Sequence, residues 1–232
     1  MDEVFTRSKM IWADEIEVDG NTYSKEIICQ RLLPMVTEER RIKLHQVVDE
    51  RDLGIVTLLE QVHDLGNISA VMRTVEAFGY PRLQLLESGN HKYKPANRVT
   101  KGTDKWLDLK RHRDFGPCFK ELKDQGLRIC ISAFEGATSI EKVDWNIDSV
   151  VVFGNERDGV TSDMLKSADL KFKIPMYGFA QSFNISVAAA MTMHHIKLNR
   201  TQPSISEGQK TSLMANYLLR CFDQPGRLLR NL

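Results

Sequence analysis

Short apolar runs alternate with amphipathic stretches along most of the chain. The clearest run is Ser-Val-Val-Val-Phe at residues 149–153, a pattern typical of a strand that is buried on both faces. Further strands are predicted over residues 55–59, 83–86, 106–110, 127–132 and 170–174. Runs this short, bounded by turn-forming residues, favour strands over buried helices.

Helical patterns separate these strands. Thr37 precedes Glu38 and Glu39, so we expect it to cap a helix over residues 37–51. Asn67 is expected to cap a helix over residues 67–78 that Gly79 ends. Further helices are predicted over residues 114–125, 161–168 and 184–198 and within 207–222.

Alternating strands and helices predict an α/β fold with a mainly parallel sheet and helices on both faces. We expect three segments: an N-terminal extension with its helix at 1–51, a central domain at 52–200, and a C-terminal helical extension at 201–232. Residues 1–34 show a mixed pattern to which we assign no element.

The composition is that of an ordinary globular protein, with 42% hydrophobic and 27% charged residues. The four cysteines form no CxxC pair and show no zinc-like spacing with histidine, so we expect reduced thiols and no metal site. No apolar run is long enough to span a membrane, and the first residues resemble no secretory signal. We therefore expect a cytoplasmic, or at least nucleocytoplasmic, protein without a membrane partner.

Three loops follow predicted strands and precede predicted helices, at residues 63–74, 153–165 and 174–191. Ligands of open parallel sheets bind at the carboxyl ends of strands, so these loops are the candidate site. None contains a GxGxxG, Walker, GxSxG or HExxH motif, which excludes the common nucleotide-binding and hydrolase signatures.

Each loop allows a functional and a purely structural interpretation. Ser182 and Asn184 either shape a ligand site or simply cap a core helix. Glu156, between two glycines, binds a ligand, pairs with a base, or is a solvated carboxylate. Arg73 shares a helix face with Asn67 and offers a fork of donors suited to phosphate, or is an ordinary surface arginine.

Taken together, the three loops resemble the SpoU/TrmH family of RNA ribose 2′-O-methyltransferases in the SPOUT superfamily. The first motif matches Asn67-Ile68-Ser69-Ala70 with Arg73, Ala77 and Gly79. The second matches Gly154-Asn155-Glu156 with Gly159-Val160. The third matches Ile174-Pro175-Met176 with Gly178, Gln181-Ser182 and Asn184-Ile185-Ser186-Val187-Ala188. The motifs occur in the family's order, and the resemblance covers residues 36–195.

The resemblance implies a sheet whose C-terminal part is threaded as a deep trefoil knot, S-adenosylmethionine held by the knot loops, and a homodimer. It implies cofactor contacts from Ser132, Ala133, Gly154, Asn155, Ile174, Met176, Ser182 and Phe183. It implies Arg73 as the key catalytic residue, with Asn67, Glu156, Ser182 and Asn184. A guanidinium stays protonated, so Arg73 either takes a proton with help from an RNA phosphate or only positions the ribose.

Two positions depart from the family pattern. Phe183 stands where leucine is common, and Asp64-Leu65-Gly66 replaces the frequent Lys-Pro-His. The helix directly before the first strand and the short C-terminal helix look like TrmH-type tRNA guanosine methyltransferases, which implies the D-loop guanosine-18 of tRNA as the target. Methylation of rRNA ribose and an inactive knotted RNA-binding scaffold stay as alternatives.

The charge distribution adds a candidate RNA contact. The net charge is only +1, but residues 91–113 hold eight basic residues against Asp104 and Asp108. Seven of the bases are predicted to contact RNA phosphates: Lys92, Lys94, Arg98, Lys101, Lys105, Arg111 and Arg113. Arg220, Arg227 and Arg230 add a basic C-terminal end. A solvated charged face is the alternative.

Overall fold

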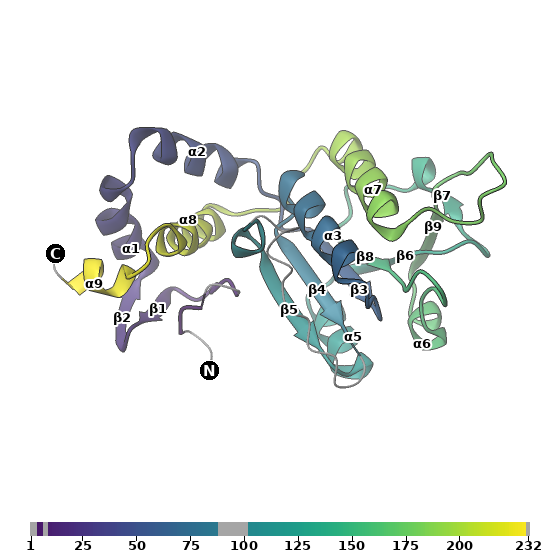
Figure 1. Cartoon of the computed structure of the whole chain (residues 1–232), viewed down its shortest axis with the longest axis horizontal. Helices are drawn as coiled ribbons and strands as arrows, with labels where there is room; N and C mark the ends of the chain where they lie inside the picture. The colour runs from purple at the N-terminus through teal and green to yellow at the C-terminus, as the bar shows by residue number, and fades with distance from the viewer. Residues whose placement is uncertain (1–3, 7–8, 88–101, 231–232) are drawn as a thin grey trace. The chain divides into compact units, whose positions relative to one another are not determined.

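The computed structural model describes residues 4–6, 9–87 and 102–230. The chain divides into two compact units (Figure 1). The terminal unit consists of Met1–Arg51, Lys105–Asp108 and Ile205–Leu232, and the sheet unit of Asp52–Asp104 and Leu109–Ser204. Both extensions predicted at the chain ends thus contribute to the same compact unit.

A seven-stranded sheet forms the centre of the sheet unit, in the order β5-β4-β3-β8-β6-β9-β7. Its strands are β3 (Ile55–Glu60), β4 (Arg82–Leu86), β5 (Asp108–His112), β6 (Arg128–Ser132), β7 (Thr138–Ser139), β8 (Ser149–Phe153) and β9 (Leu170–Lys173). Every pair from β4 through to β7 is parallel. The parallel α/β fold expected from the sequence is therefore confirmed.

Helices lie on both faces of the sheet. α3 (Leu65–Ala77) and α7 (Ile185–Asn199) pack against each other on one face (Figure 1). On the other face, α5 (Phe115–Asp124) and α6 (Ser162–Lys166) cover the side chains that alternate strand residues present. Val56 and Leu58 belong to this apolar cluster, and burial of each such side chain stabilises the fold by about 1.5–3 kcal/mol. Short 3₁₀ helices occur at Asp104–Trp106 and Ile140–Lys142.

Two local predictions are wrong. Asn67 does not cap α3: the helix begins at Leu65, and the Asp64 carboxylate accepts a hydrogen bond of 2.6 Å from the Asn67 amide instead. Aspartate and asparagine are equally good caps, so the pattern could not choose between them. The strand predicted at 106–110 begins two residues later, because Trp106 lies in a 3₁₀ turn and packs edge-on against Tyr217.

A buried arginine anchors the C-terminal end of α7. The Arg200 guanidinium contacts Asp52 Oδ2 and Asp148 Oδ1, each at 2.5 Å, and donates to the carbonyl oxygens of Trp145 and Asn146. Burial alone would lower the pKa of Arg200, but its hydrogen bonds with Asp52 and Asp148 raise that pKa above the ordinary value. The helix is thereby fixed to the segments that precede β3 and β8.

The terminal unit contains a hairpin that the sequence analysis did not assign. β1 (Glu15–Val18) and β2 (Asn21–Ser24) are antiparallel and joined by Asp19 and Gly20, both at positive φ. Asp-Gly between alternating apolar residues is a strong hairpin signal, so the pattern was available in the sequence. The unit's helices are α1 (Lys25–Leu32), the 3₁₀ turn Leu33–Met35, α2 (Glu38–Asp49), α8 (Glu207–Cys221) and α9 (Pro225–Arg230).

The core of the terminal unit joins the two ends of the chain. Ile16, Ile28 and Leu32 pack in one cluster with Leu213 and Leu218. Arg220, expected to be part of a basic C-terminal end, is instead buried.

Carbonyl oxygens explain why this arginine is buried. The Arg220 guanidinium donates to the carbonyl of Asn216 at 2.8 Å and to that of Lys9 at 2.6 Å. These partners satisfy the donors of the buried guanidinium, which removes Arg220 from the predicted basic surface.

Candidate active site

A cavity of about 500 Å³ opens at the carboxyl ends of β6, β8 and β9. This volume is within the usual range for sites that hold a small organic ligand. All eight residues predicted to contact a cofactor line it: Ser132, Ala133, Gly154, Asn155, Ile174, Met176, Ser182 and Phe183. The structure thus brings together residues from three separate strand ends.

Residues that the sequence analysis did not select also line the cavity. Phe134, Arg157 and Lys173 are among them. Each lies within a few residues of a predicted contact, so proximity to the three motifs is the signal that could have found them.

One wall of the cavity is residues 154–161, here called the folded-back loop. Its backbone closes on itself, because the amides of Asn155 and Gly159 each donate to the other residue's carbonyl, at 2.9 and 2.8 Å. A Cβ on Gly154 would lie 2.2 Å from the carbonyl carbon of Gly159. Gly159 has a φ of +70°, so both glycines are required by this geometry.

The Asn155 side chain braces the folded-back loop further. Its Oδ1 accepts from the amides of Arg157, at 2.8 Å, and Asp158, at 3.3 Å. Its Nδ2 donates to the carbonyl of Gln61, at 2.7 Å, directly after β3. The loop is therefore fixed both internally and to the neighbouring strand.

A second part of the cavity wall is residues 174–184, here called the exposed loop. Tyr177 and Phe179 are almost fully exposed, at 95% and 109% of their reference area. Residues 176–183 make no hydrogen bond with any residue that the structure describes. Phe183 nevertheless contributes to the cavity wall and is about one third exposed.

A chain of hydrogen bonds links the three loops. The Ser186 amide donates to Asn184 Oδ1 at 2.9 Å, Asn184 Nδ2 to Asn67 Oδ1 at 3.1 Å, and Asn67 Nδ2 to Glu156 Oε1 at 2.6 Å. A backbone N–H only donates and a carboxylate only accepts, so the two ends fix the orientation of both amide side chains. Asn67, Asn184 and Glu156, predicted as catalytic, are thus brought together.

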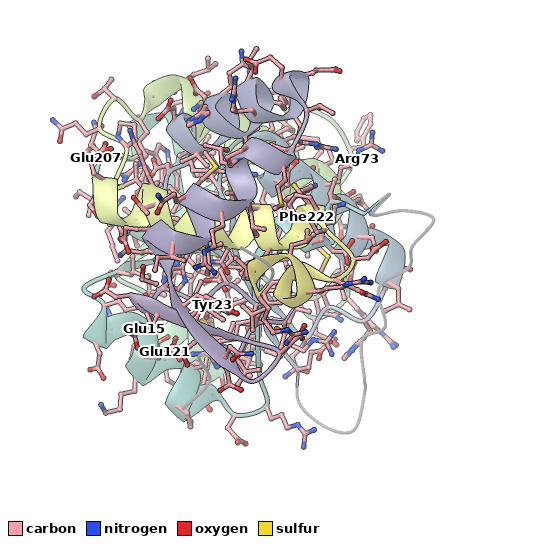
Figure 2. The ribbon with its side chains drawn as sticks, turned by 90° about the vertical axis from the view of Figure 1, so that its left-hand side faces the viewer. Glu15, Tyr23, Arg73, Glu121, Glu207 and Phe222 are labelled. Atoms are coloured by element: carbon pink, nitrogen blue, oxygen red, sulfur yellow. The ribbon has the colours of Figure 1, made fainter. Side chains whose placement is uncertain are left out.

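Arg73 is not part of this chain. It lies six residues after Asn67 on α3, about 9 Å further along the helix axis. Its side chain is exposed, at the molecular surface in Figure 2, and makes no hydrogen bond or ion pair with the described residues. Asn67, Ala70 and Thr74 are also more exposed than their buried neighbours, as a shared outer face requires.

The predicted RNA contacts are only partly visible. Lys92, Lys94, Arg98 and Lys101 lie outside the described residues. The Lys105 ammonium lies 4.6 Å from the centre of the Trp106 ring in the terminal unit. In the sheet unit, Arg111 on β5 and Arg113 directly after it are exposed, on either side of the buried His112. Burial lowers the pKa of His112, which favours its neutral form.

No helix in the described ranges combines the length and the apolar character that crossing a membrane requires. Among the same residues, no group of three or more histidine, cysteine, aspartate or glutamate side chains could hold a metal ion.

Comparison with known proteins identifies close relatives. A tRNA (guanosine(18)-2′-O)-methyltransferase from Thermus thermophilus is 35% identical over 73% of this chain and 87% of its own length. The crystal structure of the A. aeolicus TrmH/SpoU tRNA modifying enzyme matches 79% of this chain and 97% of that one, with a TM-score of 0.72 and 28% identity. A 23S rRNA (guanosine(2553)-2′-O)-methyltransferase from Bacillus subtilis is 27% identical over 61% of this chain and 57% of its own length.

The family itself follows from the central part of the chain. Residues 54–194 match the model of the SpoU rRNA Methylase family. This segment covers more than half of the chain and contains all three motifs and every residue of the cavity. The resemblance inferred from the motifs is therefore confirmed, and the chain belongs to the SpoU rRNA Methylase family of RNA methyltransferases.

Proposed function

We propose that the protein transfers a methyl group from S-adenosylmethionine to the ribose 2′-hydroxyl of guanosine-18 in the D-loop of tRNA. The observation that carries the proposal is the convergence of all eight predicted cofactor contacts on one cavity. The choice of tRNA is supported by coverage, because the tRNA methyltransferase from Thermus thermophilus is matched over 87% of its length and the rRNA methyltransferase over 57%.

The cavity suits S-adenosylmethionine chemically. Phe153, Ile174 and Ile185 would provide apolar surface for the cofactor. Backbone groups at the ends of β6, β8 and β9, with Asn155 and Ser182, provide hydrogen-bonding partners for the ribose and amino-acid parts. When bound, the cofactor supplies an electrophilic methyl group.

Catalysis by this chain then consists mainly of alignment. The hydrogen bonds from Asn184 through Asn67 to Glu156 hold the cavity walls and α3 in a fixed relation. This relation orients the groups around the methyl donor. Arg73, exposed and without a protein partner among the described residues, is available to an RNA phosphate and to the ribose. Its role is to position the 2′-hydroxyl and to stabilise charge that develops there.

We further infer the trefoil knot that the family resemblance implies. β9 is separated from β3 by β6 and β8 in the sheet order. After β9 the chain passes through the exposed loop and returns to α7, which packs against α3 (Figure 1). This return path past the ends of β6 and β8 supports threading of the C-terminal segment.

We also infer a homodimer. Val187, Met191 and Leu198 are 46%, 41% and 69% exposed, and with His194 they follow one face of α7 at helical spacing. A stripe of this kind on a helix next to the cavity supports pairing with a second copy.

A cytoplasmic location is supported by the cysteines. Cys29, Cys118, Cys130 and Cys221 are all free thiols. Burial raises the pKa of the Cys29 and Cys118 thiols to about 12, so both are unreactive at neutral pH and suit a reducing compartment.

The test is transfer of labelled methyl to tRNA transcripts and to rRNA, followed by mapping of the modified ribose. We expect label at guanosine-18 and none when that nucleotide is 2′-deoxyguanosine. Arg73→Ala should lower kcat by about 10²–10³-fold, with Arg73→Lys in between. Label confined to rRNA would favour the rRNA alternative, and a protein that binds no S-adenosylmethionine would favour the scaffold.

The RNA surface has its own test. Arg111 and Arg113 are proposed to contact phosphates together with the basic residues of 92–105. The affinity for tRNA should therefore fall steeply between low and physiological salt, because each neutralised phosphate releases counterions. An affinity for tRNA that does not depend on salt would contradict the proposal that these residues contact RNA phosphates.

A further inference from the structure

Glu60, the last residue of β3, is a buried carboxylate without a counterion. Its exposed fraction is 1%, and it forms no ion pair with any residue that the structure describes. Asp52, the other buried carboxylate of the sheet unit, is neutralised by Arg200 at 2.5 Å. A buried charge is costly to the fold unless its oxygens are well satisfied, so the partners of the Glu60 oxygens decide what this carboxylate does.

The two carboxylate oxygens of Glu60 both bind one residue, Thr161. Oε2 accepts from the Thr161 amide at 2.9 Å, and Oε1 accepts from its hydroxyl at 2.6 Å. Thr161 is the last residue of the folded-back loop and the N-cap of α6, where its Oγ1 accepts from the Met164 amide at 3.3 Å. Glu60 therefore fixes the point at which the cavity wall ends.

The neighbouring residue fixes the other end of the same wall. The carbonyl of Gln61 accepts from Asn155 Nδ2 at 2.7 Å. Leu59 is level with Phe153 in the pairing of β3 with β8, so Glu60 and Gln61 lie beside the start of the folded-back loop. The last residue of β3 and the residue directly after it thus hold both ends of the loop that lines the cavity.

We propose that Glu60 is a positioning residue for cofactor binding, which holds the folded-back loop in its binding geometry through Thr161. The proposal rests on the proposed function, because it takes the cavity to be the S-adenosylmethionine site. Glu60 itself is absent from the cavity lining, so it acts through the loop rather than on the ligand.

The side chains around Glu60 allow a substitution that distinguishes a positioning role from a merely structural one. Strand alternation places its side chain on the same face as Val56 and Leu58, which pack in an apolar cluster with Met164 and Val160. A leucine at this position would extend that cluster and remove the cost of a buried charge. A structural role for Glu60 predicts that Glu60→Leu destabilises the fold, whereas positioning predicts weaker ligand binding without loss of thermal stability.

The experiment measures binding of S-adenosylmethionine and of S-adenosylhomocysteine by calorimetry, together with the Tm of the ligand-free protein. Glu60→Leu should weaken binding of both ligands by about tenfold while the Tm is unchanged or higher. Thr161→Val, which removes the hydroxyl bond to Glu60 and the N-cap bond from the Met164 amide but keeps the bond from its own amide, should weaken binding by roughly threefold.

Three conservative changes provide controls. Thr161→Ser keeps the hydroxyl and should bind like the wild type. Glu60→Gln can still accept from the Thr161 amide and donate to its hydroxyl, so binding should stay within about threefold of the wild type. Thr57→Val, on the same strand, removes a buried hydroxyl that has no partner among the described residues, and should leave binding unchanged.

Two outcomes would overturn the proposal. The first is wild-type binding of both ligands by Glu60→Leu. The second is a loss confined to S-adenosylmethionine, which would mean that the charge of Glu60 acts directly on the sulfonium. A wild-type protein that binds neither ligand would instead refute the proposed function, so the two failures are distinguishable.

Discussion

The two walls of the cavity are built in different ways. The folded-back loop is closed by its own backbone, braced by Asn155 and held at both ends by Glu60 and Gln61. The exposed loop makes no hydrogen bond over residues 176–183 with the described residues and presents Tyr177 and Phe179 to solvent. One wall is thus preorganised by the sheet, and the other is not.

Because of this difference, the two loops lose unequal amounts of conformational entropy when the ligand binds. Fixing the backbone of one residue costs about 1–2 kcal/mol, and the folded-back loop has already lost that freedom on folding. The exposed loop must lose it when the cofactor, a second copy of the chain or RNA covers it. Changes in the folded-back loop should therefore distort a formed site, while changes in the exposed loop should be absorbed.

Backbone hydrogen exchange should show the contrast most strongly. The amides of Asn155, Gly159 and Thr161 are hydrogen-bonded and should exchange roughly 100-fold more slowly than those of residues 177–183 in the ligand-free protein. Addition of S-adenosylhomocysteine should slow the second group and change the first little. Equal rates in the two loops would remove the distinction altogether.

Gly154→Ala should give the largest effect on cofactor affinity among the substitutions in the two loops. The new Cβ meets the Gly159 backbone at 2.2 Å, so the folded-back loop has to open. We expect S-adenosylmethionine affinity to fall roughly 10- to 100-fold in calorimetry, the loss produced by over-packing a rigid site. A variant that binds like the wild type would show that the folded-back loop can open to accept the new Cβ without loss of binding.

Glu156→Ala tests the connection between the folded-back loop and α3. It leaves Asn67 Nδ2 without its 2.6 Å acceptor and breaks the link from α3 to the folded-back loop, while the Ser186 amide still orients Asn184. Because water can replace part of this bond, we expect kcat/KM for methyl transfer to fall only about tenfold. Glu135→Ala, an exposed carboxylate outside the cavity lining, is the matched control and should leave the rate unchanged.

Gly178→Ala should have the smallest effect and sharpens the contrast with Gly154. A Cβ at this position meets no atom within 4 Å, and the exposed loop has room to adjust. Affinity for S-adenosylmethionine should stay within about twofold of the wild type. A loss as large as that of Gly154→Ala would mean that the exposed loop is as strictly shaped as its counterpart.

Local pattern predicted the elements better than the contacts between them. Apolar runs located the strands of the parallel sheet, and Asn184 was correctly expected to cap α7. The Asp19-Gly20 hairpin was missed although its signal was present. Where two good caps stood close together, at Asp64 and Asn67, the pattern gave the wrong one.

The hydrogen-bonded parts of the site were beyond sequence reasoning. Asn67 meets Glu156 across 89 residues and Asn184 across 117, separations over which no local preference acts. Glu60 looked like the polar end of an apolar strand, and its burial depends on Thr161, 101 residues away. Arg220 was assigned to a basic C-terminal end because the Lys9 carbonyl, which accepts from its guanidinium together with the nearby Asn216 carbonyl, comes from the opposite end of the chain.

That meeting of the two chain ends has a consequence for biosynthesis. Ile28 and Leu32 leave the ribosome well before the α8 residues that cover them, such as Leu213 and Leu218, which are made roughly 185 residues later. At roughly 5–20 residues per second, the first half of this core waits about 10–40 s for its partner. During that interval the nascent chain exposes apolar side chains that are buried in the folded protein. Binding of a chaperone would therefore prevent aggregation most effectively at this stage.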